Sequence, residues 1–253
     1  MSIVQPIFRR AAVLLGEPAM ERLAQRRVII FGVGGVGSWC AEALVRTGVH
    51  HLTIVDFDRV DVTNVNRQLM ATTQTVGQPK VDALRERLLA INPDADIVAL
   101  AQTFTEDTAP DFRLGDYDYI IDAIDSLKDK ALLIELACQT RARLFSSMGA
   151  ALKFDPTRVQ VAEFWKVKGD PLARALRNRF KKQQRFPKRK FKCVFSDEPA
   201  QSPAGEGRAS AGGVEGPVMP GEGKGSLVQL TAVFGMTLAS LVVKDVVEEP
   251  AAL

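Results

Sequence analysis

Short apolar runs alternate along this chain with longer stretches in which apolar residues recur every three or four positions. The short runs are rich in β-branched residues, which is typical of strands buried on both faces, and the longer stretches are typical of amphipathic helices. Strands that alternate with helices predict a Rossmann-like α/β fold with a doubly wound, mostly parallel sheet. We expect strands at residues 27–31, 52–55, 96–101, 119–123 and 144–147, and helices at residues 38–47, 81–91 and 128–139.

The pattern changes on both sides of this predicted sheet. Residues 1–26 are expected to form an N-terminal helical segment, interrupted at Gly16 and Pro18. Beyond the fifth strand we expect one more strand at residues 159–164 and a short helix at residues 170–180. The predicted organisation is a main domain at residues 27–165, a basic and Gly/Pro-rich flexible segment at residues 166–226, and a closing helix at residues 227–253 that packs on the core.

The closing segment contains a long apolar run. Residues 227–243 carry no formal charge, and their length lies at the short limit for a membrane-spanning helix. Polar and small residues interrupt the run, at Gln229, Thr231, Gly235, Thr237 and Ser240. We therefore expect a buried core helix, with membrane contact as the alternative. Because residues 1–10 lack the apolar stretch of a secretory signal, we expect a cytoplasmic protein.

Charge is distributed unevenly along the chain. Of 253 residues, 33 are basic and 30 are acidic, and the net charge of +3 excludes little by itself. Residues 166–192 hold twelve basic residues and one acid, Asp170, so this segment carries +11 and the rest of the chain −8. Cys40, Cys138 and Cys193 form no C-x-x-C pair, so we expect neither a disulfide framework nor a cysteine zinc site.

A glycine-rich motif follows the first expected strand and opens the helix after it. Residues 32–37 fit G-x-G-x-x-G, with glycines at Gly32, Gly34, Gly35 and Gly37. Such glycines allow a tight turn and a close approach of phosphate, and the helix N-terminus offers free N–H groups to it. Asp56 ends the second strand, where a carboxylate can accept hydrogen bonds from ribose hydroxyls. We predict nucleotide binding; the alternative is a glycine turn without a ligand.

The residues that follow distinguish ATP from a dinucleotide. Asp58, Asn64, Arg67 and Gln68 come after the second strand, and Lys80 lies at the start of the next expected helix. Cations beside the phosphates are unnecessary for hydride transfer, whereas a triphosphate carries about four negative charges that must be neutralised. We therefore expect an enzyme that splits ATP rather than an NAD-dependent oxidoreductase.

Two aspartates, Asp122 and Asp125, lie at the end of the fourth expected strand and just beyond it. In an open parallel sheet, ligands bind beyond the carboxyl ends of the strands. Asp125 is therefore predicted to hold Mg²⁺ against the phosphates. Asp122 lies within the strand end, so we expect a structural role for it, with Lys130 as its partner.

The chain from Arg27 to about Gly149 resembles the adenylating domain of the ubiquitin-activating-like ThiF/MoeB/HesA superfamily. The matching residues are Gly32, Gly34, Gly37, Asp56, Asp58, Asn64, Arg67, Gln68, Lys80 and Asp125. The resemblance implies ATP and Mg²⁺ as cofactors and catalytic roles for Arg67, Lys80 and Asp125. It also implies a homodimer in which an arginine finger enters from the partner subunit. Arg10 falls on the matching position, although Ile7 stands where members usually have another arginine.

Further pieces resemble one branch of this superfamily, the tRNA threonylcarbamoyladenosine dehydratases. These pieces are Asp125-Ser126, Asp155-Pro-Thr, Val159-Gln-Val, Asp170-Pro-Leu and Cys193-Val-Phe-Ser. The branch implies ATP-dependent cyclisation, formally a dehydration, of threonylcarbamoyladenosine in tRNA through an acyl-adenylate. One alternative is adenylation of the C-terminus of a ubiquitin-like sulfur-carrier protein. The other is a nucleotide-sensing scaffold, and a sulfur-transfer protein is a further candidate partner.

A tRNA substrate, as the resemblance implies, gives the basic segment an expected role. Basic residues with Phe180, Phe186 and Phe191 among them suit RNA phosphates and splayed bases; the alternative is a solvated run of charge. The candidate RNA contacts are Arg177, Lys181, Lys182, Arg185, Lys188, Arg189 and Lys190. For Cys193, which follows directly, we expect a small buried residue, with a nucleophile as the alternative.

Overall fold

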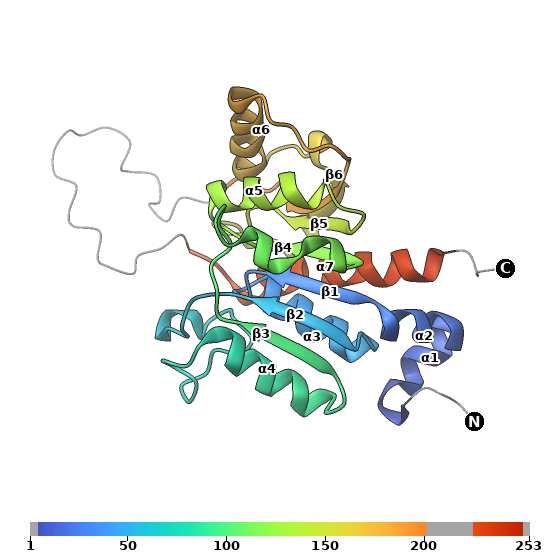
Figure 1. The fold of residues 1–253 in the computed structure, drawn as a ribbon. Helices are drawn as coiled ribbons and strands as arrows, with labels where there is room; N and C mark the ends of the chain where they lie inside the picture. Colours follow the sequence, from blue (N-terminus) through green and yellow to red (C-terminus); the bar gives the residue numbers. More distant parts are fainter. Residues whose placement is uncertain (1–4, 201–224, 250–253) are drawn as a thin grey trace.

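The computed structural model describes residues 5–200 and 225–249, and a seven-stranded sheet runs through them (Figure 1). The strand order is β3-β2-β1-β4-β5-β7-β6. Neighbouring strands pair in parallel except for β6, which is antiparallel to β7. The strands are β1 (Arg27–Phe31), β2 (His51–Val55), β3 (Asp96–Leu100), β4 (Tyr119–Asp122), β5 (Arg143–Ser147), β6 (Val159–Glu163) and β7 (Lys192–Ser196). The predicted Rossmann-like, mostly parallel α/β fold is confirmed.

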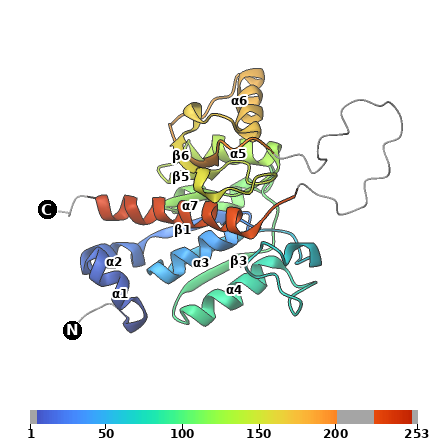
Figure 2. The same cartoon turned by 180° about the vertical axis from the view of Figure 1, so that it is seen from behind.

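Helices cover both faces of the sheet (Figures 1 and 2). Alternate residues of a strand point to opposite faces: Val28 and Ile30 of β1 pack with α3, α4 and α7, whereas Ile29 and Phe31 pack with α5 and α6. All four side chains are buried, which is why β1 is a continuous apolar run. The helices are α1 (Arg9–Leu15), α2 (Glu17–Gln25), α3 (Gly37–Thr47), α4 (Lys80–Ile91), α5 (Leu127–Ala137), α6 (Pro171–Gln183) and α7 (Val228–Glu248).

The N-terminal helices α1 and α2 lie at the amino ends of the strands. Gly16, with a φ of 82°, separates them, and Pro18 occupies the first turn of α2, where its missing N–H costs nothing. The guanidinium of Arg22 donates to the carbonyl of Val246 near the end of α7, at 3.1 and 3.2 Å. This contact ties the two ends of the described chain together at the edge where β1 begins.

The expected flexible segment at residues 166–226 is wrong over residues 166–196. These residues contain helix α6 and strand β7, which is part of the sheet. β7 pairs with both β5 and β6, and α6 buries Ala173, Leu176 and Phe180. Sequence patterning missed β7 because its apolar run is short and lysines precede it. The remainder of that predicted segment lies largely at residues 201–224, outside the described residues.

The closing helix α7 is 21 residues long and contains an 18-residue stretch with a mean hydropathy of 1.7, so by length and composition it could cross a membrane. Every fourth residue from Leu230 to Val246 is completely buried. A Cβ on Gly235 would lie 2.4 Å from the carbonyl oxygen of Val36, so glycine is what lets α7 approach the start of α3. This packing is that of a core helix, as expected.

Candidate functional site

The glycine loop is a tight turn between β1 and α3 whose backbone leaves no room for side chains at two positions. Gly32 has a φ of 83°, and a Cβ there would lie 2.7 Å from the carbonyl oxygen of Ala123 after β4. A Cβ on Gly37 would lie 1.9 Å from the carbonyl oxygen of Gly32. At Gly34 the nearest atom to such a Cβ is the Nε2 of Gln68, at 3.6 Å. Two glycines therefore shape the turn, and Gly34 leaves its backbone open to a ligand.

Gly35 faces the rest of the protein rather than open space. A Cβ at this position would lie 3.2 Å from the Cγ2 of Thr231 on α7 and 3.4 Å from the Cγ of Arg67. Gly35 therefore allows α7 and the loop after β2 to close around the glycine loop. The G-x-G-x-x-G pattern alone does not show that Gly35 is required for this packing.

Asp56, just after β2, binds the backbone of the glycine loop through its carboxylate. Its Oδ2 accepts from the backbone N–H of Val33 at 2.8 Å, and its Oδ1 accepts from the N–H of Asp58 at 3.0 Å. Burial raises the pKa of Asp56, and Lys80 opposes that shift. Each carboxylate oxygen has two acceptor positions, so Asp56 can also accept from the hydroxyls of a bound ribose.

Gln68 places an unsatisfied polar atom beside the glycine loop. Its side chain is 7% exposed, and its buried Oε1 has no hydrogen-bond partner within the described residues. A buried polar atom without a partner is costly, so this oxygen fits a ligand that donates a hydrogen bond. Asn64 is also buried, but its Oδ1 accepts from the N–H of Asp61 at 3.1 Å and closes the short turn at Val62–Asn64. Asn64 therefore shapes the loop.

Two cations flank the same loop. Lys80 is 6% exposed, and its Nζ lies 2.6 Å from the Oδ2 of Asp58. Arg67 is half-buried, and its guanidinium donates to the carbonyl of Thr63 and to the Oδ1 of Asn66, both at 2.9 Å. Each cation is therefore oriented by neighbours of its own loop. Together with the free N–H groups at the start of α3, they make a site that suits phosphate.

A buried ion pair supports the turn that carries Asp125. Asp122 and Lys130 are both 0% exposed, and the Nζ of Lys130 lies 2.9 Å from the Oδ2 of Asp122 and 2.9 Å from the carbonyl oxygen of Ile124. The Oγ of Ser146 donates to Asp122 at 2.6 Å. Burial raises the pKa of Asp122, and Lys130 opposes that shift. Asp122 and Lys130 are thus the structural pair that we predicted.

Asp125 itself is exposed at the N-terminus of α5, beyond the carboxyl end of β4. Residues 5–200 and 225–249 contain no group of three side chains from His, Cys, Asp and Glu that could hold a metal ion. A single carboxylate cannot fill the coordination sphere of Mg²⁺. However, Mg²⁺ is commonly held by one or two carboxylates together with substrate phosphates. The donor set therefore fits Mg²⁺ only in the presence of a phosphorylated substrate.

Arg10 lies far from these residues. It is exposed on α1, at the amino ends of the strands, whereas the glycine loop follows the carboxyl end of β1 (Figure 1). The two neighbouring apolar residues Val13 and Leu14 are 84% and 83% exposed. Arg10 therefore does not reach the nucleotide site of its own chain.

The basic segment differs from our expectation in its aromatic residues. Phe180 and Phe191 are 1% and 5% exposed, and both rings pack against Phe164. The interpretation that they stack on RNA bases is wrong, because the apolar face of α6 and the start of β7 bury them. Phe186 is 45% exposed.

The predicted RNA contacts divide into two groups. Arg177 and Arg189 donate to backbone carbonyls, and Arg185 pairs with Glu135 at 2.8 Å. These three arginines brace the fold around α5 and α6. The other four predicted contacts, Lys181, Lys182, Lys188 and Lys190, are exposed and have no ion pair within the described residues.

Cys193 lies in the core, and the nucleophile alternative does not agree with its position. The side chain is 0% exposed on β7, between β5 and β6. Burial raises the pKa of the thiol well above its usual range, and a buried thiol is neither ionised nor accessible.

Lys153 is a buried residue at the carboxyl edge that sequence reasoning missed. Its Nζ donates to the Oδ2 of Asp170 at 3.2 Å and to the carbonyl oxygen of Ser196 at 2.7 Å. Asp170 also accepts from the N–H groups of Gly149 and Ala173. This cluster joins the ends of β5 and β7 to the start of α6. Asp170 could have been noticed as a helix cap before proline, whereas nothing in the pattern marks Lys153.

The fold and the site define a nucleotide-binding α/β protein with two cations beside the glycine loop at the carboxyl edge of its sheet. The model of the ThiF family matches residues 8–252, and the chain belongs to this family. It is 36% identical to the tRNA threonylcarbamoyladenosine dehydratase of Escherichia coli K12 over 96% of this chain and 94% of that protein. It is 44% identical to the Bacillus subtilis protein of the same name over 76% of this chain and 74% of that protein.

A solved structure agrees with these relationships. The crystal structure of E. coli tRNA N6-threonylcarbamoyladenosine dehydratase in complex with ATP matches this fold with a TM-score of 0.82 at 34% identity. The match covers 94% of this chain and 93% of that chain. The similarity therefore extends over the sheet, the carboxyl-edge site and the closing helix.

Proposed function

We propose that this protein uses ATP to dehydrate threonylcarbamoyladenosine in tRNA to its cyclic form, in the cytoplasm. The observation that carries the proposal is the near full-length match to dehydratases of this specificity. The glycine loop, Asp56, Gln68 and the two cations supply the groups that binding and activating ATP requires.

The first step is adenylation of a carboxylate. The threonyl carboxylate of the modified adenosine attacks the α-phosphorus of ATP, a P–O bond forms, the α–β phosphoanhydride breaks and pyrophosphate leaves. In our proposal the N–H groups of the glycine loop bind phosphate, Asp56 accepts from the ribose, and Lys80 and Arg67 offset the charge of the triphosphate. Mg²⁺, when bound, would add charge neutralisation, with Asp125 as its protein ligand.

The second step closes the ring. A nitrogen of the carbamoyl group attacks the acyl carbon, a C–N bond forms, and the bond to AMP breaks as the nitrogen loses its proton. The AMP carries away the carboxylate oxygen, so the product has lost the elements of water. The protein contributes mainly position and electrostatic stabilisation.

The direct test is to incubate the protein with threonylcarbamoyladenosine-bearing tRNA, ATP and Mg²⁺ and to weigh the nucleosides by mass spectrometry. We expect the modified nucleoside to lose the mass of one water while AMP and pyrophosphate appear. Asp125→Ala should abolish this product and retain the fold, because Asp125 is exposed. Exchange between pyrophosphate and ATP that depends on a sulfur-carrier protein, with no change in the tRNA, would contradict the proposal.

We further propose that the working form is a homodimer in which Arg10 completes the partner's site. Arg10 is exposed beside the apolar Val13 and Leu14, at the edge of the sheet opposite the glycine loop of its own chain. Mixing the inactive variants Arg10→Ala and Asp125→Ala tests this arrangement. A heterodimer would hold one intact site, so random mixing should recover about a quarter of native activity. No recovery, with dimer exchange verified, would exclude a finger from the partner.

A further inference from the structure

A basic cavity of about 400 Å³ opens at the amino ends of β5 and β7. This is the edge of the sheet opposite the glycine loop, since β1, β4, β5 and β7 run parallel. We call it the amino-edge groove. Its charged lining consists of five basic residues and one acid, namely Arg141, Arg143, Arg189, Lys190, Lys192 and Asp245. Two of these cations, Arg141 and Arg143, were not singled out by the sequence, because the turn before β5 lies far along the chain from the basic segment. Lys192 ends the basic segment but was not among the candidate RNA contacts.

The acid in the groove already has a partner on each of its carboxylate oxygens. The Oδ1 of Asp245 lies 2.9 Å from Arg143, and its Oδ2 accepts from the hydroxyl of Tyr119 at 2.8 Å. The guanidinium of Arg189 donates to the carbonyls of Cys138 and Ala142 at 3.2 and 2.7 Å. Arg189 therefore builds the wall of the groove.

Three cations remain available to a ligand. Arg141, Lys190 and Lys192 are exposed, and they make no ion pair or side-chain hydrogen bond within residues 5–200 and 225–249. Three unpaired positive charges around one concave surface raise the local concentration of polyanions.

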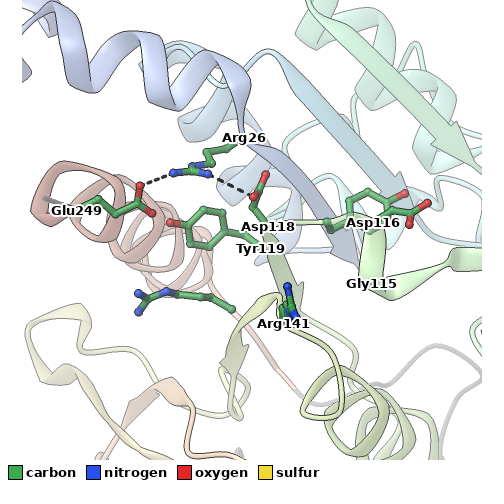
Figure 3. Close-up of a pocket in the computed structure, with 9 residues that line it drawn as sticks. Arg26, Gly115, Asp116, Asp118, Tyr119, Arg141 and Glu249 are labelled. Carbon is green, nitrogen blue, oxygen red and sulfur yellow. Dashed lines mark hydrogen bonds and ion pairs between the residues drawn. The ribbon is translucent and has the colours of Figure 1, made fainter. Parts of the chain in front are cut away.

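A neighbouring cavity differs from the groove in its balance of acidic and basic residues. It measures about 300 Å³ and shares Arg141 and Arg143 with the groove. Figure 3 shows Arg26 between Glu249 and Asp118, with an ion pair to each. This cavity is lined by as many acids as cations, three of each, whereas the amino-edge groove has one acid for five cations.

We propose that the amino-edge groove binds the phosphate backbone of the substrate RNA. This inference rests on the proposed function, which supplies an RNA substrate. Phe145 and Phe191 in the lining are each 5% exposed, so they form the floor and cannot stack on bases. Contacts confined to phosphates position an RNA without reading its sequence. The groove therefore holds the body of the RNA and does not select the nucleotide to be modified.

Helix α6 runs from the other edge of the sheet towards this groove. α6 begins at the carboxyl edge, where Asp170 accepts from the N–H of Gly149, and ends near the amino edge, with Lys181 and Lys182 in its last turn. The two edges are separated by a five-residue strand, or about 13–17 Å at the usual rise per residue. A single nucleoside cannot span this length, whereas a tRNA arm can.

The test compares Lys190→Gln/Lys192→Gln with a matched control, Arg113→Gln/Lys244→Gln. The control changes net charge equally at positions that are 75% and 65% exposed and lie outside the groove. Affinity for tRNA is measured by fluorescence anisotropy at several KCl concentrations, and ATP affinity by calorimetry. Losing two phosphate contacts should weaken tRNA binding about 10- to 30-fold at 0.15 M salt and reduce the slope of log K against log salt by about 1.4 to 1.8. ATP affinity should not change, and the KM for tRNA should rise with little change in kcat.

The outcomes separate this inference from the proposed function. If the native protein dehydrates tRNA while the groove variant binds tRNA with the affinity and salt slope of the control, the groove proposal is overturned. If the groove variant shows the expected loss but the native protein never removes water from the modified nucleoside, the proposed function fails and the groove stands as an RNA site.

Discussion

Lys130→Met should destabilise the fold strongly, and by an amount that depends on pH. The ammonium of Lys130 is the only cation in contact with Asp122 among the described residues, and both side chains are completely buried. Breaking a buried ion pair by removing one partner costs about 3–5 kcal/mol, because the other charge is left without compensation. Such a loss is between about a fifth and the whole of a usual domain stability of about 5–15 kcal/mol.

The pH dependence follows from the direction of the pKa shift. Burial already holds the pKa of Asp122 above its usual range. The stability linked to this group is therefore greatest at low pH and is lost as the pH rises through the folded-state pKa. Removing Lys130 raises that pKa further. Holding an ordinary aspartic acid protonated costs about 4 kcal/mol at pH 7 and about 1.5 kcal/mol at pH 5, so the penalty should shrink by roughly 2–3 kcal/mol over this range.

Urea unfolding at pH 7 and pH 5, followed by tryptophan fluorescence, measures both effects. Lys244→Met is the matched control, because Lys244 is 65% exposed and pairs with Glu248 on the surface of α7 at 3.6 Å. Such a pair contributes about 0.3–0.5 kcal/mol. The double variant Asp122→Asn/Lys130→Met should recover much of the loss, since it removes both buried charges. The reasoning is refuted if Lys130→Met costs no more than Lys244→Met, or if its cost is the same at both pH values.

The remaining predictions concern the glycines and Cys193. Gly37→Ala should lower the unfolding temperature markedly, because its Cβ would lie 1.9 Å from a backbone oxygen. Gly34→Ala should leave the unfolding temperature unchanged and weaken ATP binding measured by calorimetry. Equal unfolding temperatures for the two variants would contradict this expectation. Gly235→Ala should cost about 1–3 kcal/mol in urea unfolding by forcing α7 away from α3, and an unchanged midpoint would argue against their close contact. Cys193→Ala should keep kcat within about twofold with a small loss of stability; a folded but inactive variant would restore the nucleophile hypothesis.

Where the residues of the candidate nucleotide site lie could largely be predicted, because local chemistry determines it. A glycine motif directly after a buried strand fixes a turn, and the topology of parallel strands brings the ends of β1, β2 and β4 to one edge. Asp56, Gln68, Lys80 and Asp125 therefore lie around that edge although they are distant in sequence. The partnership of Asp122 and Lys130 was also foreseen, since a buried acid at a strand end requires a partner.

The basic segment shows what only the tertiary structure decided. By composition, residues 166–192 are one strongly positive run, but packing divides them into buried aromatic residues, arginines that bind backbone carbonyls, and free lysines. The insertion of β7 between β5 and β6 makes this division, and it brings Lys190 and Lys192 beside Arg141 from a distant turn. Sequence determines which charges and apolar residues a chain has and how they repeat locally. Which of those charges are left free for a partner depends on long-range contacts, because each charge is satisfied or exposed by residues that the fold brings to it.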